Sequence, residues 1–143
     1  MNRPISEQTV LISGAGRGLG AAIATAFARQ SARVAINYHR SQSSAEALAA
    51  RLGPRTAAYQ ADVSDPQAVQ AMVARVADEL GPPTTLVHNA LADFSFNGDA
   101  RTHLDALEWS DVAAQAEVAV GGLLNTLTAL DDHFIAAQGG RVI

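Results

Sequence analysis

Short apolar runs alternate along this chain with longer segments in which apolar residues recur at helical spacing. The runs are typical of strands buried on both faces, and the periodic segments are typical of helices that lay one face on a sheet. Strands are predicted at 9–13, 33–38, 56–61 and 84–88, and a fifth begins at 141. Helices are predicted from 18 to about 30, between 41 and 53, from 65 to 80, and from roughly 105 to 137.

Capping residues support these boundaries. Asp65 followed by Pro66 is a strong helix start, because a carboxylate accepts hydrogen bonds from the first N–H groups and proline fits the first turn. Gly53 and Gly81 close the two middle helices. The apolar faces expected to pack on the sheet are Leu19, Ile23, Ala26 and Phe27; Ala45, Leu48, Ala49 and Leu52; Val69, Met72, Val73, Val76 and Leu80; and Val120, Leu123, Leu124, Leu127 and Phe134.

The alternation of strand and helix implies parallel strands joined by right-handed crossovers. The predicted fold is therefore a doubly wound α/β sheet in three layers, formed by residues 1–143 as a single domain. The sequence stops soon after the fifth strand begins. From this we expect a truncated fifth strand and the N-terminal part of a longer protein, with a C-terminal catalytic portion missing.

Composition narrows the class of function. The net charge of −4 argues against nucleic acid or an anionic membrane as the main partner. Cysteine is absent, which excludes disulfides and thiol catalysis and fits a reducing compartment. There is no signal peptide and no apolar run of membrane-spanning length, so we expect a cytoplasmic protein. All ten basic residues are arginine, a point that bears on catalysis below.

The most informative segment follows the first strand and reads Ser13-Gly14-Ala15-Gly16-Arg17-Gly18-Leu19-Gly20. A strand that breaks into glycines and reopens as a helix holds a nucleotide pyrophosphate, because glycines permit close backbone approach and the helix offers unpaired N–H groups. The spacing is Gly-x-x-x-Gly-x-Gly over Gly14, Gly18 and Gly20. The ordinary Gly-x-Gly-x-x-Gly pattern fails, since its last glycine would fall on Leu19.

This loop resembles that of the short-chain dehydrogenase/reductase family, Thr-Gly-x-x-x-Gly-x-Gly, with Ser13 in the hydroxyl position. Asp62-Val63 follows the third strand, where the family places an Asp-Val pair against the adenine. His88-Asn89-Ala90-Leu91 follows the fourth, where the family carries Asn-Asn-Ala-Gly, so His88 and Leu91 depart from the pattern. The resemblance covers the chain from the first strand to the fifth and implies a Rossmann-type NAD(P)-binding domain.

The choice of cofactor depends on the end of the second strand. NAD enzymes place an acidic residue there to bind the ribose hydroxyls, whereas 36–41 contains no carboxylate. Arg17 and Arg40 are predicted to hold a 2′-phosphate, which arginine binds bidentately. NADP (NADPH) is therefore expected and NAD is disfavoured; that both arginines are merely solvated remains the alternative.

The expected cofactor-binding residues share the ends of the first four strands and the glycine loop. They are Ser13, Gly14, Arg17, Gly18, Leu19, Gly20, Asn37, Arg40, Asp62, Val63, Asn89 and Ala90. No metal site is expected, because the four histidines lack ligand spacing.

No catalytic residue is predicted within the chain. The resemblance implies a Tyr that protonates the substrate oxygen, a Lys four residues later that lowers its pKa, a Ser, and an Asn on the long helix. The chain has no lysine, only Tyr38 and Tyr59 as tyrosines, and Ala119 at the Asn position, while Asn125 reads as a structural polar residue. The missing groups are expected after Ile143, and this chain alone is expected to be inactive.

The resemblance implies an NADP-dependent reductase that interconverts carbonyl and hydroxyl groups, and a homo-oligomer when intact. Residues 91–100 are reminiscent of 3-oxoacyl-carrier-protein reductases, which makes an acyl thioester a candidate substrate. A catalytically inert nucleotide-binding module or truncated family member stays open. An S-adenosylmethionine-dependent methyltransferase is a distant third, since Gly14, Gly16 and Gly18 also fit its loop but the strand-end acid is missing.

Overall fold

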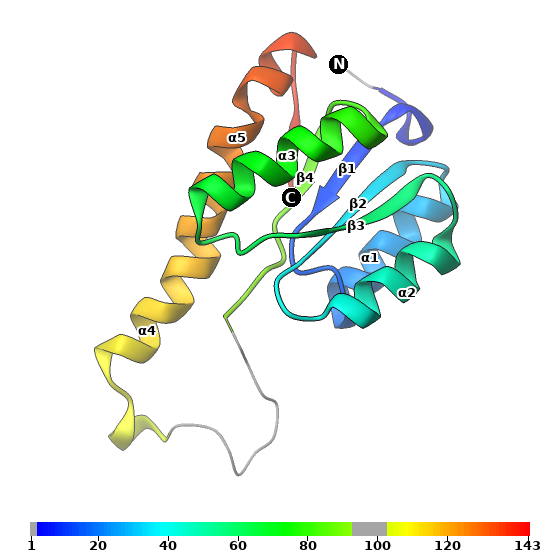
Figure 1. The fold of residues 1–143 in the computed structure, drawn as a ribbon. Helices are drawn as coiled ribbons and strands as arrows, with labels where there is room; N and C mark the ends of the chain where they lie inside the picture. Colours follow the sequence, from blue (N-terminus) through cyan, green and yellow to red (C-terminus); the bar gives the residue numbers. More distant parts are fainter. Residues whose placement is uncertain (1–2, 93–102) are drawn as a thin grey trace.

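A five-stranded parallel sheet of order β3-β2-β1-β4-β5 forms the centre of the computed structural model, which describes residues 3–92 and 103–143 (Figure 1). The strands are β1 (Thr9–Ile12), β2 (Arg33–Tyr38), β3 (Thr56–Gln60), β4 (Thr85–Val87) and β5 (Arg141–Val142). In the register, Leu11 of β1 lies opposite Ala35 of β2 and Leu86 of β4. The predicted parallel, doubly wound sheet is confirmed.

Helices cover both faces of the sheet. One face carries α1 (Gly18–Arg29) and α2 (Gln42–Leu52), and the other carries α3 (Pro66–Leu80) and α5 (Gly122–Ala136), which lie side by side (Figure 1). Val10 and Ile12 point into the first layer, whereas Leu11 between them points into the second. This alternation makes two apolar clusters and gives the three layers that the sequence predicts.

The predicted helix ends are built as expected. Asp65 Oδ1 accepts hydrogen bonds from the backbone N–H groups of Gln67 (2.9 Å) and Ala68 (3.2 Å). Gly53 and Gly81 follow α2 and α3 with φ of 99° and 95°, a backbone region that favours glycine. Local capping chemistry therefore sets these boundaries.

The predicted helix at 105–137 is wrong in its first part and along one face. It is replaced by a 3₁₀ turn (Leu104–Ala106), α4 (Trp109–Ala116), the π turn η4 (Glu117–Gly121) and α5. One extra residue in a π turn rotates the following side chains by about 100°. Val120 and Leu124, expected in the core, are 67% and 65% exposed. The residues of the predicted face that do pack on the sheet are Leu123, Leu127 and Phe134.

The predicted inner face of α1 also needs correction. Ile23 and Phe27 pack against the core, but Leu19 is 71% exposed and Ala26 is exposed as well. Leu19 belongs to the first turn of α1, at the glycine loop. Gly20 and Ala24 are the residues of α1 that are fully buried, so small side chains make the close approach to the sheet.

Two further features complete the fold. β5 pairs with β4 through Arg141 opposite Thr85 and Val142 opposite Leu86. Among the residues that the structure describes, no helix is both long and apolar enough to cross a lipid bilayer. Residues 93–100 of the segment that resembles acyl-carrier-protein reductases lie outside the described residues.

Replacing Asp65 by alanine removes the two cap hydrogen bonds of α3 and should lower the free energy of unfolding by about 1 kcal/mol. Urea denaturation followed by circular dichroism measures this. Asp78→Ala is the matched control, because Asp78 is an exposed carboxylate further along the same helix. Equal losses in the two variants would contradict a capping role.

Candidate functional site

The candidate site lies at the carboxyl ends of β1 and β4. The chain runs from β1 outward through β2 and β3 and then returns to β4 on the other side of β1. Such a reversal leaves a crevice at the strand ends, where α/β proteins bind ligands. The glycine loop after β1 and residues 88–90 after β4 meet there, and the backbone N–H of Ser13 donates to the carbonyl of Val87 (3.0 Å).

Ser13 and Asn89 join the two strand ends. Ser13 is 1% exposed, and its Oγ accepts hydrogen bonds from the backbone N–H groups of Asn89 (2.9 Å) and Ala90 (3.0 Å). In return, Asn89 Nδ2 donates to the carbonyls of Ser13 (3.2 Å) and Gly14 (3.1 Å). The predicted pair of motifs is therefore one hydrogen-bonded unit that fixes the glycine loop to β4.

The three glycines of the motif differ in what they require. A Cβ on Gly20 would lie 2.7 Å from Asn89 Nδ2 and 2.7 Å from the carbonyl oxygen of Gly14, so the start of α1 fits only without a side chain. Gly14 has φ of 62°, and a Cβ there would meet Ala90 Cα at 2.9 Å. Gly18 has φ of 58° and nothing within 4 Å of its Cβ position. Its backbone borders open space.

Asn37 supports the loop from β2. Its Oδ1 accepts a hydrogen bond from the backbone N–H of Gly14 (3.2 Å), and its Nδ2 donates to the carbonyl of Ala61 (3.0 Å). The backbone N–H of Ala15 donates to the carbonyl of Asn37 (2.8 Å). Asn37 is 1% exposed, so its amide is buried among these partners and braces the loop from beneath.

Charged groups gather beyond the buried end of β2. His39, Arg40 and Arg17 are all exposed. Asp62 Oδ1 accepts from Ser64 N (3.0 Å) and Ser64 Oγ (2.7 Å), and its Oδ2 lies 3.6 Å from His39 Nε2. The Ser64 hydroxyl does most to lower the pKa of Asp62, burial opposes it, and the positive groups of His39 and Arg40 lower it further. Asp62 is therefore ionised at neutral pH, beside the ring of His39.

Val63 and Asn125 tie the loop after β3 to α5. A Cβ on Gly122 would meet Val63 Cγ2 at 2.6 Å, so α5 packs directly on this loop. Asn125 Nδ2 donates to the carbonyls of Val63 (3.0 Å) and Ser64 (3.2 Å). Asn125 therefore has the structural role that its sequence position suggested.

The sequence reasoning missed two sets of contacts in this neighbourhood. A Cβ on Gly16 would run into the side chain of Ser41, so the loop also touches the start of α2. His88 bridges Ser13 and Val118, with Nδ1 3.1 Å from Ser13 Oγ and Nε2 3.3 Å from the Val118 carbonyl oxygen. The departure of His88 from the family motif was the available signal for it.

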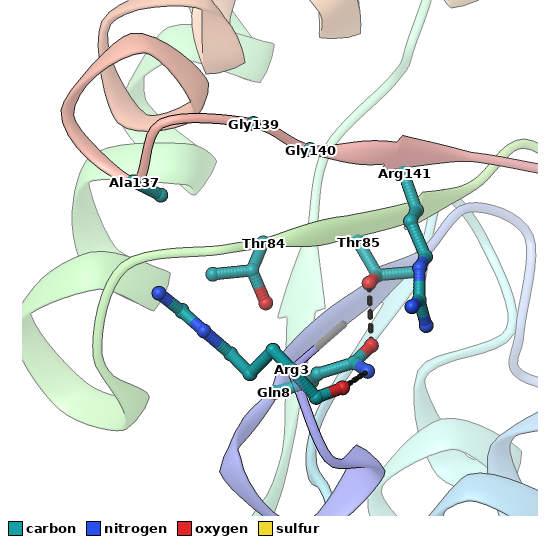
Figure 2. Close-up of a pocket in the computed structure, with 8 residues that line it drawn as sticks. All are labelled: Arg3, Gln8, Thr84, Thr85, Ala137, Gly139, Gly140 and Arg141. Carbon is teal, nitrogen blue, oxygen red and sulfur yellow. Dashed lines mark hydrogen bonds between the residues drawn. The ribbon is translucent and has the colours of Figure 1, made fainter. Parts of the chain in front are cut away.

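A small cavity lies at the opposite edge of the sheet, at the amino ends of β4 and β5 (Figure 2). Gln8 spans it, donating through Nε2 to the Arg3 carbonyl (2.9 Å) and accepting from Thr85 Oγ1 (2.7 Å). Its volume of about 60 Å³ holds a few water molecules but not a dinucleotide. Within the described ranges, no cluster of three or more histidine, aspartate or glutamate residues could hold a metal ion.

Comparison with known proteins agrees with this geometry. Residues 8–143 match the family described as short chain dehydrogenase. The 3-oxoacyl-[acyl-carrier-protein] reductase FabG of Staphylococcus aureus is 30% identical over 95% of this chain, which spans 54% of that protein. Curated relatives are matched over about half of their length or less.

Two solved structures share the fold. The 3-ketoacyl-(acyl-carrier-protein) reductase of Brucella melitensis complexed with NADH has a TM-score of 0.83 at 27% identity, covering 96% of this chain and 56% of that one. A gluconate 5-dehydrogenase from Burkholderia cenocepacia in complex with NADP and tartrate has a TM-score of 0.79 at 29% identity, covering 95% and 52%.

Ser13→Ala should lower the free energy of unfolding by about 2 kcal/mol or more, because the amides of Asn89 and Ala90 lose their acceptor. Ser43→Ala is the matched control: Ser43 is exposed on α2, where such changes stay within about 0.5 kcal/mol. Chemical denaturation of both variants measures the difference. A Ser13→Ala protein as stable as the Ser43→Ala protein would contradict the linking role of the hydroxyl.

Proposed function

We propose a function from the premise that this chain belongs to the short-chain dehydrogenase family, whose model matches residues 8–143. The chain binds NADP(H) at the carboxyl ends of β1 and β4, as the cofactor-binding part of an oxidoreductase that interconverts carbonyl and hydroxyl groups. The observation that carries the proposal is the glycine loop, held by Ser13, Asn37 and Asn89 while the Gly18 backbone borders open space. When bound, the nicotinamide supplies or accepts the hydride.

The start of α1 is proposed to bind the pyrophosphate. Arg17, its N-cap residue, makes no side-chain cap hydrogen bond, and the first turn contains no acidic residue. The first N–H groups of a helix have no partner within the helix, and the helix dipole is positive there. An anionic phosphate is therefore the fitting partner, with Gly14, Gly18 and Gly20 permitting its close approach.

NADP is proposed rather than NAD because of the residues that are expected to surround the ribose. No carboxylate follows β2, and Asn37 is engaged beneath the loop, so no strand-end acid is present to bind a 2′-hydroxyl. Arg17 and Arg40 are exposed nearby and suit a 2′-phosphate. One similar structure contains NADP and another contains NADH, so the proposed preference rests on the residues of this chain and not on the comparison.

The remaining proposed contacts to the cofactor come from residues at the carboxyl ends of the strands and from the first turn of α1. Asp62 and Val63 are proposed to face the adenine, and Asn89 and Ala90 to line the ribose side. Leu19, 71% exposed in the first turn of α1, is proposed to pack on the bound cofactor. The carboxylate of Asp62 is already engaged by Ser64 and His39, which suits a residue that orients the loop.

The substrate is proposed as a small carbonyl compound, with a 3-oxoacyl thioester as the candidate that similarity to a 3-oxoacyl-[acyl-carrier-protein] reductase supports. A homo-oligomer is proposed through α4, η4 and α5, where Trp109, Val120 and Leu124 are 77%, 67% and 65% exposed. A second candidate, cofactor binding without catalysis, is favoured by the absence of lysine and by Ala119 at the relay position. A cytoplasmic location stays a prediction.

The chain should bind NADPH more tightly than NADH, and Arg40→Asp should remove or reverse that preference. Losing one charge-assisted phosphate contact is expected to weaken NADPH about ten- to a hundredfold. Fluorescence titration with both cofactors gives the ratio of dissociation constants. Arg51→Asp makes the same charge change on the exposed side of α2 and should keep the preference. A preference of the unaltered chain for NADH would reject the NADP assignment.

The 143-residue chain should bind NADPH without oxidising it. It contains no lysine, so it cannot form the Tyr-x-x-x-Lys pair in which a cation lowers the phenol pKa. NADPH absorbance is followed with simple ketones and 3-oxoacyl thioesters, at cofactor concentrations that the titration shows to be saturating. Steady oxidation above the buffer blank would contradict this expectation.

A further inference from the structure

His88 lies between the glycine loop of the candidate site and the π turn η4. It follows β4, and its half-buried ring reaches Ser13 on one side and η4 on the other. A π turn displaces the regular helical hydrogen bonds, so its carbonyls can accept from an outside donor. The ring is also held sterically, because a Cβ on Gly122 would lie 3.4 Å from His88 Cε1. No sequence motif assigns a role to this histidine.

The direction of each hydrogen bond follows from the donors and acceptors present. Ser13 Oγ accepts from the backbone N–H groups of Asn89 and Ala90, which occupies both of its lone pairs. Its remaining capacity is its own proton, which it donates to His88 Nδ1 (3.1 Å). A neutral imidazole with Nδ1 as acceptor carries its proton on Nε2, which donates to the Val118 carbonyl (3.3 Å).

We propose that His88, as the neutral Nε2–H tautomer, is a positioning residue that couples the glycine loop to the π turn η4, and that tight cofactor binding requires it to stay neutral. The second half of this statement rests on the proposed function, and the first half does not. The coupling runs from the amides of Asn89 and Ala90 through Ser13 and the imidazole to Val118. It places a side chain from the end of β4 against the turn that contains Ala119.

The surroundings of His88 favour the neutral ring. Burial lowers the pKa of His88, and the carbonyls of Val118 and Ala119 partly oppose that shift. Among the described residues, η4 carries Glu117, which is exposed, and Asp62 is engaged by Ser64. The titratable groups of α5, Asp131, Asp132 and His133, lie more than two helical turns beyond Gly122, and Arg141 begins β5. After β5, the Ile143 carbonyl accepts a hydrogen bond from the backbone N–H of His88 (2.9 Å). No charged side chain contributes to the shift.

Protonation breaks the coupling at one atom. A proton on Nδ1 turns this acceptor into a donor that faces Ser13 Oγ, whose lone pairs are already occupied. Because folding lowers the pKa of His88 from the ordinary value of about 6.5, the contribution to stability is complete above that value. It is lost as the pH falls through the lowered pKa of the folded chain.

Nitrogen-15 NMR of the histidine rings tests the coupling without any cofactor. At neutral pH we expect the His88 proton on Nε2 and an unprotonated Nδ1 that shifts when Ser13 is replaced by alanine. The same spectra, recorded at falling pH, give the pKa of His88 directly. A proton on Nδ1, or a charged ring at neutral pH, would overturn the proposal.

The effect on the site is measured as NADPH affinity between pH 8 and pH 5 for the unaltered chain, His88→Ala and His88→Gln. The unaltered chain should lose about tenfold in affinity, the equivalent of one hydrogen bond, around the pKa found by NMR. His88→Ala should bind about tenfold more weakly at pH 8. His88→Gln should recover part of that loss, because its amide both accepts and donates, and should show a flatter profile because it does not titrate.

His103→Gln is the matched control, since His103 is exposed ahead of the 3₁₀ turn Leu104–Ala106, and its pH profile should follow that of the unaltered chain. A cofactor phosphate titrates near pH 6 in every variant, so the difference from His88→Gln isolates the imidazole. An identical fall in affinity with His88→Gln would overturn the proposed dependence on a neutral ring. Absence of NADPH binding at any pH would instead reject the proposed function, while the NMR result would still judge the coupling.

Discussion

The hydroxyl of Ser13 is the interaction on which the rest of the site depends. Ser13 directly follows the central strand β1 and is 1% exposed. Its Oγ accepts hydrogen bonds from the backbone N–H groups of Asn89 and Ala90, which follow β4. Leaving either amide buried without an acceptor would lower the free energy of unfolding by roughly 1–3 kcal/mol. Because Asn89 returns two hydrogen bonds to the loop, the strand ends cannot separate without breaking the whole set. These hydrogen bonds hold the glycine loop in one position, and a binding loop that is already held in place lowers the entropic cost of binding a ligand.

Most of the fold and the location of the site can be predicted from local sequence patterns. Buried parallel strands are continuous apolar runs, Asp65 with Pro66 caps α3, and Ser13, Gly14, Gly18, Gly20 and Asn89 stand in readable motifs. The inner face of the last helical segment did not follow, because the π turn η4 interrupts the regular helical phase before α5. Val120 and Leu124 fit the regular 3.6-residue period, yet both are exposed, and Val120 lies within the π turn itself.

Side-chain roles were harder to predict than positions. Asn37 lies one residue before the end of β2, where a ligand contact is the natural expectation, but its amide is hydrogen-bonded to Gly14 and Ala61 beneath the loop. Only the approach of β3 supplies Ala61, so no local pattern contains this partner. Asp62 likewise has a neighbour in His39 that lies far away in sequence. The pairing of β2 with β3 brings the carboxylate of Asp62 beside His39.

Cofactor binding and carbonyl chemistry are separable in this architecture for a physical reason. A pyrophosphate is recognised mainly by backbone N–H groups and a helix dipole, and the β1–α1 loop is the segment proposed to supply them here. Proton donation by a phenol requires an adjacent cation to lower its pKa, and a lysine is the residue that the family uses. Pyrophosphate binding requires only that the loop be held in place. Hydrogen bonds of Ser13 after β1, Asn37 in β2 and Asn89 after β4 hold it there. The two requirements therefore fall on different residues, and the hydrogen bonds of Ser13, Asn37 and Asn89 meet the need for a loop held in place.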